Sequence, residues 1–267
     1  MSAETKWADL LPRIVSAVIL IIICGVEIYL GGLPFSILVW LACGLMTWEL
    51  ARMFGASNPV ALGVMAAIVL MMVEQLPVML GSHALSLPLA VAAVLVGAAQ
   101  IARDKWIYSL FAMWILVGCY AFLVIRHAAG LEWLLWLVAV VIVSDIAGYF
   151  AGRMLGGPKF WPRVSPKKTW SGTVAGWGGA ALVGLATVVI MGGTIALWLA
   201  TLLSAVTAFA GQMGDIAESA VKRRVGIKDS SALIPGHGGV LDRFDAMLGA
   251  GAFALLLWYF DFLPGTP

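Results

Sequence analysis

Charged residues are scarce in this 267-residue chain: Asp, Glu, Lys and Arg make up only 11% of it, and its mean hydropathy is +1.01. Soluble domains carry about 25% charged residues, so the composition excludes an ordinary soluble globular protein. Apolar runs close to the roughly 20 residues that cross a bilayer recur along the chain, which indicates an integral membrane protein. These runs are continuous and lack the alternation of membrane barrel strands, so the spans are expected to be helices.

Cysteine is also rare, and its three positions exclude a disulfide framework. Cys24, Cys43 and Cys119 stand alone within apolar runs, with no CxxC pair and no spacing typical of a metal site. No internal repeat or low-complexity segment is present. The first apolar run follows Lys6 and Arg13 but lacks a convincing small-residue cleavage site, so we expect a retained helix rather than a signal peptide.

Nine candidate spans follow from the apolar runs. They cover residues 14–31, 34–53, 60–80, 84–101, 106–125, 132–151, 172–191, 194–212 and 245–262. Turn residues such as Gly31, Gly32 and Pro34 separate them. The third span is the weakest prediction, because Glu74 and Pro77 interrupt it.

The distribution of positive charge tests this layout independently. With the amino terminus cytoplasmic, fifteen of the sixteen Lys and Arg residues fall on the cytoplasmic side and only Arg126 falls outside. The expected fold class is therefore an all-α polytopic membrane protein with about nine transmembrane helices, the amino terminus cytoplasmic and the carboxyl terminus outside. Residues 1–267 form a single integral membrane domain, with cytoplasmic catalytic segments near 153–171 and 211–245.

A third of the charge is concentrated in one short stretch, since ten of the 30 charged residues lie between Asp215 and Asp245. If the eighth span continues as a helix to Gly226, four polar residues share one face at helical spacing: Asp215, Glu218, Ser219 and Lys222. A glycine-rich loop containing His237 follows. Asp242 and Asp245 then share a face at the start of the last helix.

Carboxylates that converge from two helix ends suit Mg²⁺, which one or two carboxylates and substrate phosphates commonly hold. Neighbouring Lys and Arg side chains suit a polyphosphate. The alternative is a basic loop that contacts anionic lipid headgroups, and this alternative is strongest for Arg224. Asp145, inside the sixth span, is a functional candidate by its position, although pairing with Arg153 or a hydrogen bond across helices would also explain it.

A second cytoplasmic segment contains Lys167 and Lys168 flanked by hydroxyl side chains. Such a segment, entering a helix after Gly172, can bind phosphate through its charge and its free backbone N–H groups. A lysine pair at a membrane surface is, however, more often a headgroup contact. Glu27, Glu49 and Glu74 are also embedded in apolar runs but rank lower, because no polar partners cluster around them in the sequence.

The stretch from Ser219 to Asp245 resembles the signature of the phosphatidate cytidylyltransferases, also called CDP-diacylglycerol synthases. Its fixed residues are Ser219, Val221, Lys222, Arg223, Lys228, Asp229, Ser231, Ile234, Pro235, His237, Gly238, Gly239, Val240, Asp242, Arg243, Phe244 and Asp245. Two upstream segments also resemble this family, Ser144 to Arg153 and Val164 to Thr169, with Val164 where Ile is usual. The resemblance is strong over the carboxyl-terminal half, whereas the first five spans match only in being hydrophobic.

This resemblance implies that CTP and phosphatidic acid react to give CDP-diacylglycerol and pyrophosphate. The implied catalytic residues are Lys222, Arg223, Lys228, Asp229, His237 and Asp245, and the implied substrate-binding residues are Ser165, Lys167, Lys168, Thr169, Ser219 and Arg243. The implied metal ligands are Asp215, Asp242 and Asp145, for one or two Mg²⁺ ions with a monovalent cation as an alternative for one of them. His237 is a general base or a phosphate ligand, and the second role is favoured because phosphatidate needs little deprotonation near neutral pH.

The resemblance further implies a bacterial inner-membrane location with the active site facing the cytoplasm. The expected partners are the two substrates, the lipid bilayer and a second copy in a homodimer, with no nucleic acid. A CTP-dependent polyisoprenol kinase is the nearest alternative and would transfer the γ-phosphoryl group instead. A transporter is disfavoured because the carboxylates gather at one face rather than at the bilayer midplane, and a non-catalytic lipid scaffold would not need so many opposed charges.

Overall fold

The computed structural model describes residues 3–192 and 195–263, with side chains described from residue 14 onward. Its helices are α1 (Ala3–Leu30), α2 (Gly32–Met53), α3 (Pro59–Leu80), α4 (Ser86–Ala99), α5 (Lys105–Val124), α6 (Leu131–Leu155), α7 (Trp170–Ile190), α8 (Leu197–Arg224) and α9 (Leu241–Tyr259). A π-helical turn, η1 (Ile125–Ala129), extends α5, and two short strands, β1 (Lys159–Trp161) and β2 (Ser165–Thr169), lie between α6 and α7. Each predicted span corresponds to one of these helices.

Six of the described helices are long and apolar enough to cross a membrane by length and composition: α2, α3, α5 with η1, α6, α7 and α8. The apolar part of α1, residues 14–30, and the 14-residue α4 are shorter. The 19-residue α9 carries Asp242, Arg243 and Asp245 in its first turns. The all-helical membrane architecture is thereby supported, while the number of nine spans stays a prediction.

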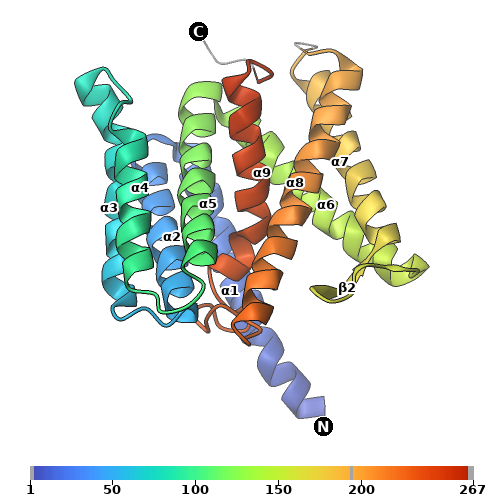
Figure 1. Cartoon of the computed structure of the whole chain (residues 1–267). Helices are drawn as coiled ribbons and strands as arrows, with labels where there is room; N and C mark the ends of the chain where they lie inside the picture. The colour runs from blue at the N-terminus through green and yellow to red at the C-terminus, as the bar shows by residue number, and fades with distance from the viewer. Residues whose placement is uncertain (1–2, 193–194, 264–267) are drawn as a thin grey trace.

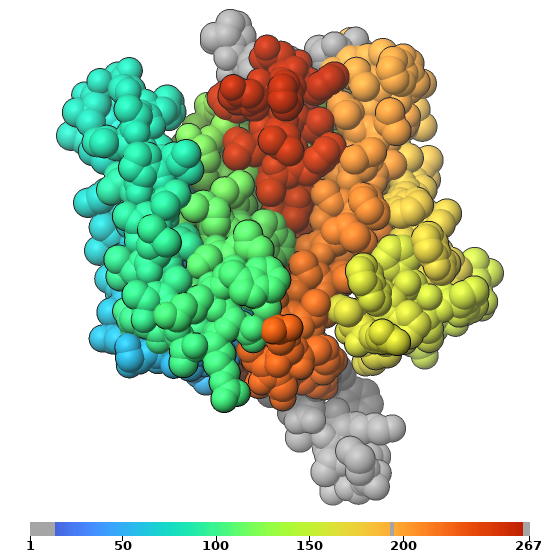
Figure 2. Space-filling model, viewed as in Figure 1, coloured from blue at the N-terminus to red at the C-terminus, as the bar shows by residue number. Residues whose placement is uncertain are grey.

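Successive helices run in alternating directions, so the two polar segments meet at one end of the bundle. In Figure 1 the start of α1, the β-hairpin and the loop after α8 lie at the lower end, whereas α9 ends at the upper end. On the face shown in Figure 2, α8 (orange) lies on the surface between α5 (green) and the hairpin region (yellow). The segments predicted to hold the chemistry therefore share one end of the molecule.

Local sequence signals explain the helix boundaries. Gly31 adopts a φ of 63° between α1 and α2, a conformation that glycine adopts without strain. Asn58 caps α3 by accepting a hydrogen bond from the Ala61 N–H at 3.1 Å, and Pro59 occupies the first helical position. Contrary to its weak prediction, α3 continues through Pro77, and Glu74 is satisfied by hydrogen bonds from α2.

The β-hairpin between α6 and α7 was not predicted. Its strands pair antiparallel, with Lys159 opposite Thr169 and Trp161 opposite Ser165. Thr169 then begins α7 as its N-cap, because its hydroxyl accepts a hydrogen bond from the Gly172 N–H at 3.2 Å. The lysine pair is thus fixed on a strand that leads directly into a helix N-terminus.

Small residues let the helices beneath this hairpin approach closely. A Cβ atom at Gly172 would lie 2.5 Å from the Gly148 carbonyl oxygen, so α6 and α7 meet backbone to backbone. The core, by contrast, is built of large apolar side chains from the central helices, including Ile115, Leu134, Leu137 and Leu248. Tight packing at the glycines sets the spacing of the elements around the site.

Candidate functional site

A polar cavity of about 540 Å³ opens where α6, the hairpin, α7 and α8 meet. Its size lies within the roughly 300–1,000 Å³ range of small-molecule sites. Its lining residues are Ser144, Asp145, Gly148, Tyr149, Gly152, Arg153, Lys167, Lys168, Thr169, Gly172, Thr173, Gln212 and Asp215. Five predicted site residues, Asp145, Lys167, Lys168, Thr169 and Asp215, are therefore brought together here.

Lys168 and Asp215 form an ion pair across the polar cavity. The Lys168 Nζ lies 2.5 Å from Asp215 Oδ2, and both side chains keep partial exposure, at 24% and 32%. Asp145 and Asp245 both interact electrostatically with Asp215. One lysine thus offsets part of a group of three carboxylates, and both charge signs remain accessible to a ligand.

Asp145 does not pair with Arg153, which was one of the structural explanations for it. The Arg153 Nη1 instead donates a hydrogen bond to the Tyr149 hydroxyl at 2.8 Å. Both Asp145 and Arg153 line the polar cavity. Their position favours a role toward a ligand over a purely structural pair.

The amino-terminal end of α7 also faces the polar cavity, through Thr169, Gly172 and Thr173. The Trp170 and Gly172 N–H groups at this end already donate to the Pro158 carbonyl and to the Thr169 hydroxyl, so the helix dipole rather than free N–H groups favours an anion here. Lys167 and Lys168 precede this end directly. The predicted combination of a lysine pair with a helix N-terminus is present, although α7 begins at Trp170, slightly earlier than expected.

Gln212 lines the polar cavity and is hydrogen-bonded to two neighbouring helices. Its Nε2 donates to Ser144 Oγ and to the Thr173 carbonyl, each at 3.3 Å, and its Oε1 accepts from Trp177 Nε1 at 2.9 Å. These bonds connect α6, α7 and α8 at one point. Gln212 was not predicted as a site residue, because its partners lie far from it in sequence.

The predicted polar face of α8 is confirmed. Ser219 Oγ lies 3.4 Å from Asp215 Oδ1, and Lys222 Nζ lies 2.5 Å from the Oε2 atom of Glu218 one turn earlier. Glu218 is fully buried, and Lys222 is its ion-pair partner. Lys222 also lies 2.7 Å from Asp242 Oδ1 and thereby joins α8 to α9.

Asp242 is surrounded by hydrogen-bond donors. Its oxygens accept from Lys222 Nζ at 2.7 Å, from the Gly239 N–H at 2.7 Å, and from the N–H and hydroxyl of Ser230 at 2.9 and 3.0 Å. A carboxylate offers about four lone-pair positions. Asp242 therefore holds the loop before α9, and its lone pairs are already in use.

Glu49 on α2 is the second carboxylate at this loop and was ranked low from the sequence. Its side chain is fully buried and accepts from the N–H groups of Val240 and Leu241 at 2.9 and 2.7 Å. It also accepts from the hydroxyls of Ser230 and Ser231 at 3.1 and 2.6 Å. We call Glu49, Asp242 and the donors they share the loop clamp, and residues 225–240 the signature loop.

His237 lies in the signature loop, outside the lining of the polar cavity, and contacts α1. The Ser16 hydroxyl lies 2.8 Å from His237 Nδ1 and donates to the Pro235 carbonyl at 3.1 Å. The roles of donor and acceptor in the contact between Ser16 and His237 depend on the tautomer of the ring.

The remaining predicted residues lie around these groups rather than in the polar cavity. Arg223, Lys228, Asp229 and Arg243 are exposed, and Ser165 is half-buried on β2. Arg224, the strongest candidate for a topological role, donates two hydrogen bonds to Asp104 at 2.9 and 2.7 Å. The Arg224 guanidinium holds the pKa of the Asp104 carboxyl below its ordinary value.

The donor set fits a hard cation in part. Within residues 3–192 and 195–263, no three His, Cys, Asp or Glu side chains are grouped as a metal site requires. Asp145 and Asp215 both face the polar cavity, and two carboxylates completed by substrate phosphates are a common Mg²⁺ arrangement. Asp242 would first have to release Lys222 or a loop donor, so its role as a ligand stays a prediction.

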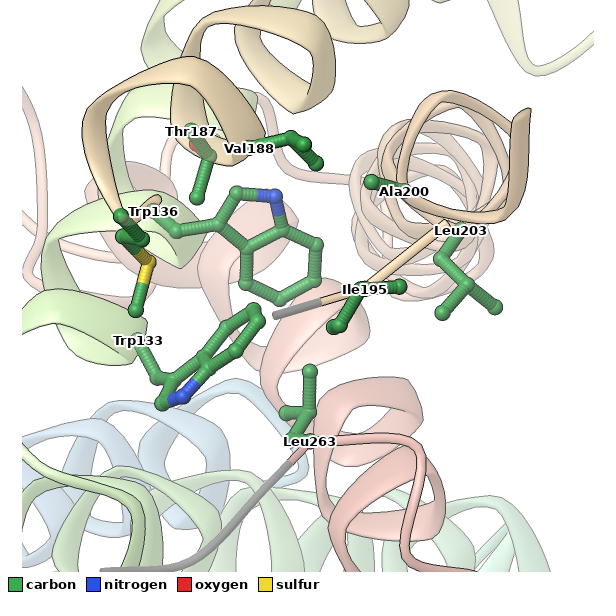
Figure 3. Close-up of a pocket in the computed structure, with 9 residues that line it drawn as sticks. Trp133, Trp136, Thr187, Val188, Ile195, Ala200, Leu203 and Leu263 are labelled. Atoms are coloured by element: carbon green, nitrogen blue, oxygen red, sulfur yellow. The ribbon is translucent and has the colours of Figure 1, made fainter. Parts of the chain in front are cut away.

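Two other hollows are apolar. One, of about 10 Å³, lies at the opposite end among Trp133, Trp136 and Leu263 (Figure 3) and has room for little more than a water molecule. The other, of about 620 Å³, runs between α5 and α8 past Trp106 and Trp114. Among these three hollows, the chemistry needed for a phosphate is found in the polar cavity.

Comparison with known proteins adds family information. A family model described as "Cytidylyltransferase family" matches residues 11–260. The chain is similar to proteins named phosphatidate cytidylyltransferase from Brucella suis (48% identity, 52% of this chain and 51% of the relative) and Staphylococcus saprophyticus (40%, 46% and 47%). It is also similar to one so named from Staphylococcus haemolyticus, at 27% identity over 88% of this chain and 94% of the relative. For the first two, the chain spans about half the length of the relative.

Proposed function

The chain belongs to the cytidylyltransferase family, and we propose that it is a phosphatidate cytidylyltransferase that transfers the CMP moiety of CTP to phosphatidic acid. The observation that supports this most strongly is the polar cavity, where Lys168 and Asp215 face each other beside the N-terminus of α7. Both charge signs at one accessible site suit a triphosphate and its cation. The three relatives share the same printed name.

In the proposed reaction, a phosphate oxygen of phosphatidate attacks the α-phosphorus of CTP. A new P–O–P bond forms, the bond between the α- and β-phosphates breaks, and pyrophosphate leaves with the electron pair. Reactions of this type depend mainly on positioning and on stabilisation of charge. Lys167 and Lys168 bind and orient phosphate oxygens in the cavity, where the positive end of the α7 helix dipole adds to their charge.

A divalent cation is part of the proposal. Mg²⁺ at Asp145 and Asp215 would supply charge neutralisation to the phosphates. Asp245 does not line the polar cavity, and its role as an additional ligand is a further part of the proposal. Asp242 keeps the role of a predicted ligand, and one metal, two metals and a monovalent companion all stay open. Chelation with EDTA is expected to abolish activity, and added Mg²⁺ to restore it.

The other proposed residues act from the cavity's edge. Lys222 is engaged with Glu218 and Asp242, so it orders the start of α9. The exposed side chains of Arg223, Lys228 and Arg243 are free to meet phosphates that approach from water. His237 keeps both proposed roles, general base and phosphate ligand, and its contact with Ser16 holds the ring beside α1.

The membrane placement follows the charge asymmetry of the sequence. We propose nine spans, a cytoplasmic amino terminus and an active site that faces the cytoplasm of a bacterial inner membrane, all within one membrane domain. The shared end of the hairpin and the signature loop in Figure 1 supports one common face. Lipid would enter laterally while CTP arrives from water, and a homodimer is a further expectation from the family resemblance.

CTP labelled separately in the cytosine and in the γ-phosphate tests this function. Purified protein in detergent receives phosphatidic acid, Mg²⁺ and each labelled CTP in parallel. We expect cytosine label in the lipid fraction and γ-label in pyrophosphate. Transfer of γ-label to a lipid alcohol would establish the kinase alternative, and no label in any lipid would contradict enzymatic function of this class.

A further inference from the structure

We propose that Glu49, on α2, is a positioning residue that fixes the signature loop and the start of α9 for the proposed transfer reaction, on which this inference rests. Glu49 lies in the amino-terminal half of the chain, far in sequence from the segments that carry the family signature. It approaches the loop from more than 180 positions away in sequence. Its role is therefore visible only in the folded molecule.

All four hydrogen bonds that Glu49 accepts come from the signature loop and α9. Oε1 accepts from Ser231 Oγ at 2.6 Å and from the Val240 N–H at 2.9 Å. Oε2 accepts from the Leu241 N–H at 2.7 Å and from Ser230 Oγ at 3.1 Å. Since unpaired N–H groups at a helix N-terminus attract negative charge, the Glu49 carboxylate is well placed to hold the start of α9.

Burial makes this interaction selective for one loop conformation. A carboxylate that is fully buried without hydrogen bonds carries a large desolvation cost. Here its four donors belong to the loop and to α9, so the cost is offset only when both are in place. The loop backbone packs tightly against the carboxylate as well, because a Cβ atom at Gly239 would collide with Glu49 and Ser230.

Ser230 links Glu49 to Asp242. Its hydroxyl lies 3.1 Å from Glu49 Oε2 and 3.0 Å from Asp242 Oδ2, and its N–H donates to Asp242 at 2.9 Å. Asp242 in turn holds Lys222 on α8 at 2.7 Å. A shift of the loop at Glu49 would therefore also move Lys222, which lies about two turns from Asp215 on the same face of α8.

Glu49→Gln tests this role, because it keeps the shape of the side chain but replaces one acceptor oxygen with an NH₂ donor. Glu74→Gln is the matched control. Glu74 on α3 is likewise a carboxylate hydrogen-bonded inside the bundle, by Ser36 and Trp40, yet it contacts no part of the signature loop. Both variants are compared with the wild type by amide hydrogen exchange of residues 229–242 and by steady-state kinetics with CTP.

We expect Glu49→Gln to lose exchange protection at Val240 and Leu241 and to lower kcat by about 10²-fold, because a displacement of about 1 Å costs that much. The KM for CTP should change less than about threefold, since Glu49 does not line the polar cavity. Glu74→Gln should keep both the wild-type kcat and the wild-type exchange pattern. If loss of a buried carboxylate merely lowered the stability of the protein, Glu49→Gln and Glu74→Gln should both be affected. The effect would then not be confined to kcat.

Wild-type kcat in Glu49→Gln, or unchanged exchange in residues 229–242, overturns the proposal. If Glu49→Gln does not fold, Ser231→Ala replaces it, because this variant removes one donor to Glu49 and should show the same pattern at smaller size. If the wild type transfers no cytidylyl group, the proposed function fails. The exchange measurement then still decides whether Glu49 fixes the loop.

Discussion

The polar cavity and the loop clamp treat their carboxylates in opposite ways. In the cavity, Asp215 is about one-third exposed and is paired with a lysine that is itself accessible. In the clamp, Glu49 is fully buried and each of its oxygens accepts two hydrogen bonds. A ligand can exchange partners with Asp215 at low cost, whereas it would have to dismantle the fold to reach Glu49.

This difference corresponds to two sets of structural elements, one that forms the polar cavity and one that holds the signature loop. The cavity is built by α6 to α8 and the hairpin, where the family resemblance is strong. The clamp depends on α2, and His237 contacts Ser16 of α1, so the first helices, which carry no signature residues, hold the loop in place. We assign the chemistry to the accessible charged groups of the polar cavity. The buried, fully hydrogen-bonded groups of the loop clamp are assigned to positioning.

The largest effect is expected from Lys168→Ala in the cavity. Loss of a cation aimed at developing phosphate charge should lower kcat/KM by about 10²–10³-fold. The melting temperature should change little, because the Lys168 side chain remains partly exposed. Lys159→Ala, an exposed lysine on the same hairpin that does not line the cavity, is the control and should keep wild-type activity. Equal losses in both variants would show that hairpin charge in general, rather than the cavity, matters.

A smaller effect is expected from Gly172→Ala, which forces α6 and α7 apart. The new Cβ would lie 2.5 Å from the Gly148 carbonyl oxygen, and overpacking of this kind costs about 1–3 kcal/mol. We expect a lower melting temperature and a raised KM for CTP. Gly178→Ala on the same helix meets open space and should be neutral or slightly stabilising. An active Gly172→Ala enzyme with an unchanged KM for CTP would show that CTP binding does not depend on the close packing of α6 and α7.

Ser16→Ala should have a modest effect that depends on His237. A neutral hydrogen bond contributes about 1 kcal/mol, which corresponds to about fivefold in kcat. In a His237→Ala background the same substitution should have a smaller effect, because the contact with the imidazole is already lost while the one with the Pro235 carbonyl remains. Additive losses in the double variant would mean that Ser16 acts elsewhere than on the imidazole.

The smallest effect is expected from Arg224→Ala, at an exposed ion pair with Asp104 that belongs to neither the polar cavity nor the loop clamp. Exposed pairs contribute little, so activity at neutral pH should match the wild type. The depressed pKa of Asp104 means that the pair stabilises the fold above the ordinary carboxyl pKa and loses this effect as the pH falls through the depressed value. The difference in melting temperature between variant and wild type should therefore be small at pH 7 and should disappear only as the pH falls through the depressed pKa of Asp104.

Hydrophobic runs predicted each α-helix of the described residues, because burial in lipid leaves a long apolar signal. The face of α8 that carries Asp215 and Lys222 was also predictable, since its contacts repeat at helical spacing. Glu49 and Gln212 were missed as site residues because their partners lie on other helices, far away in sequence. The charge of Glu49 inside a span was the signal that could have pointed to it.

Cytosine-label transfer from CTP to phosphatidate by Asp215→Asn, measured beside the wild type and Arg224→Ala, tests the central claim most directly. The account predicts that the wild type and Arg224→Ala transfer the label at similar rates, while Asp215→Asn loses at least about 10²-fold in rate and keeps its fold. Transfer by Asp215→Asn at the wild-type rate would contradict the assignment of the chemistry to the polar cavity.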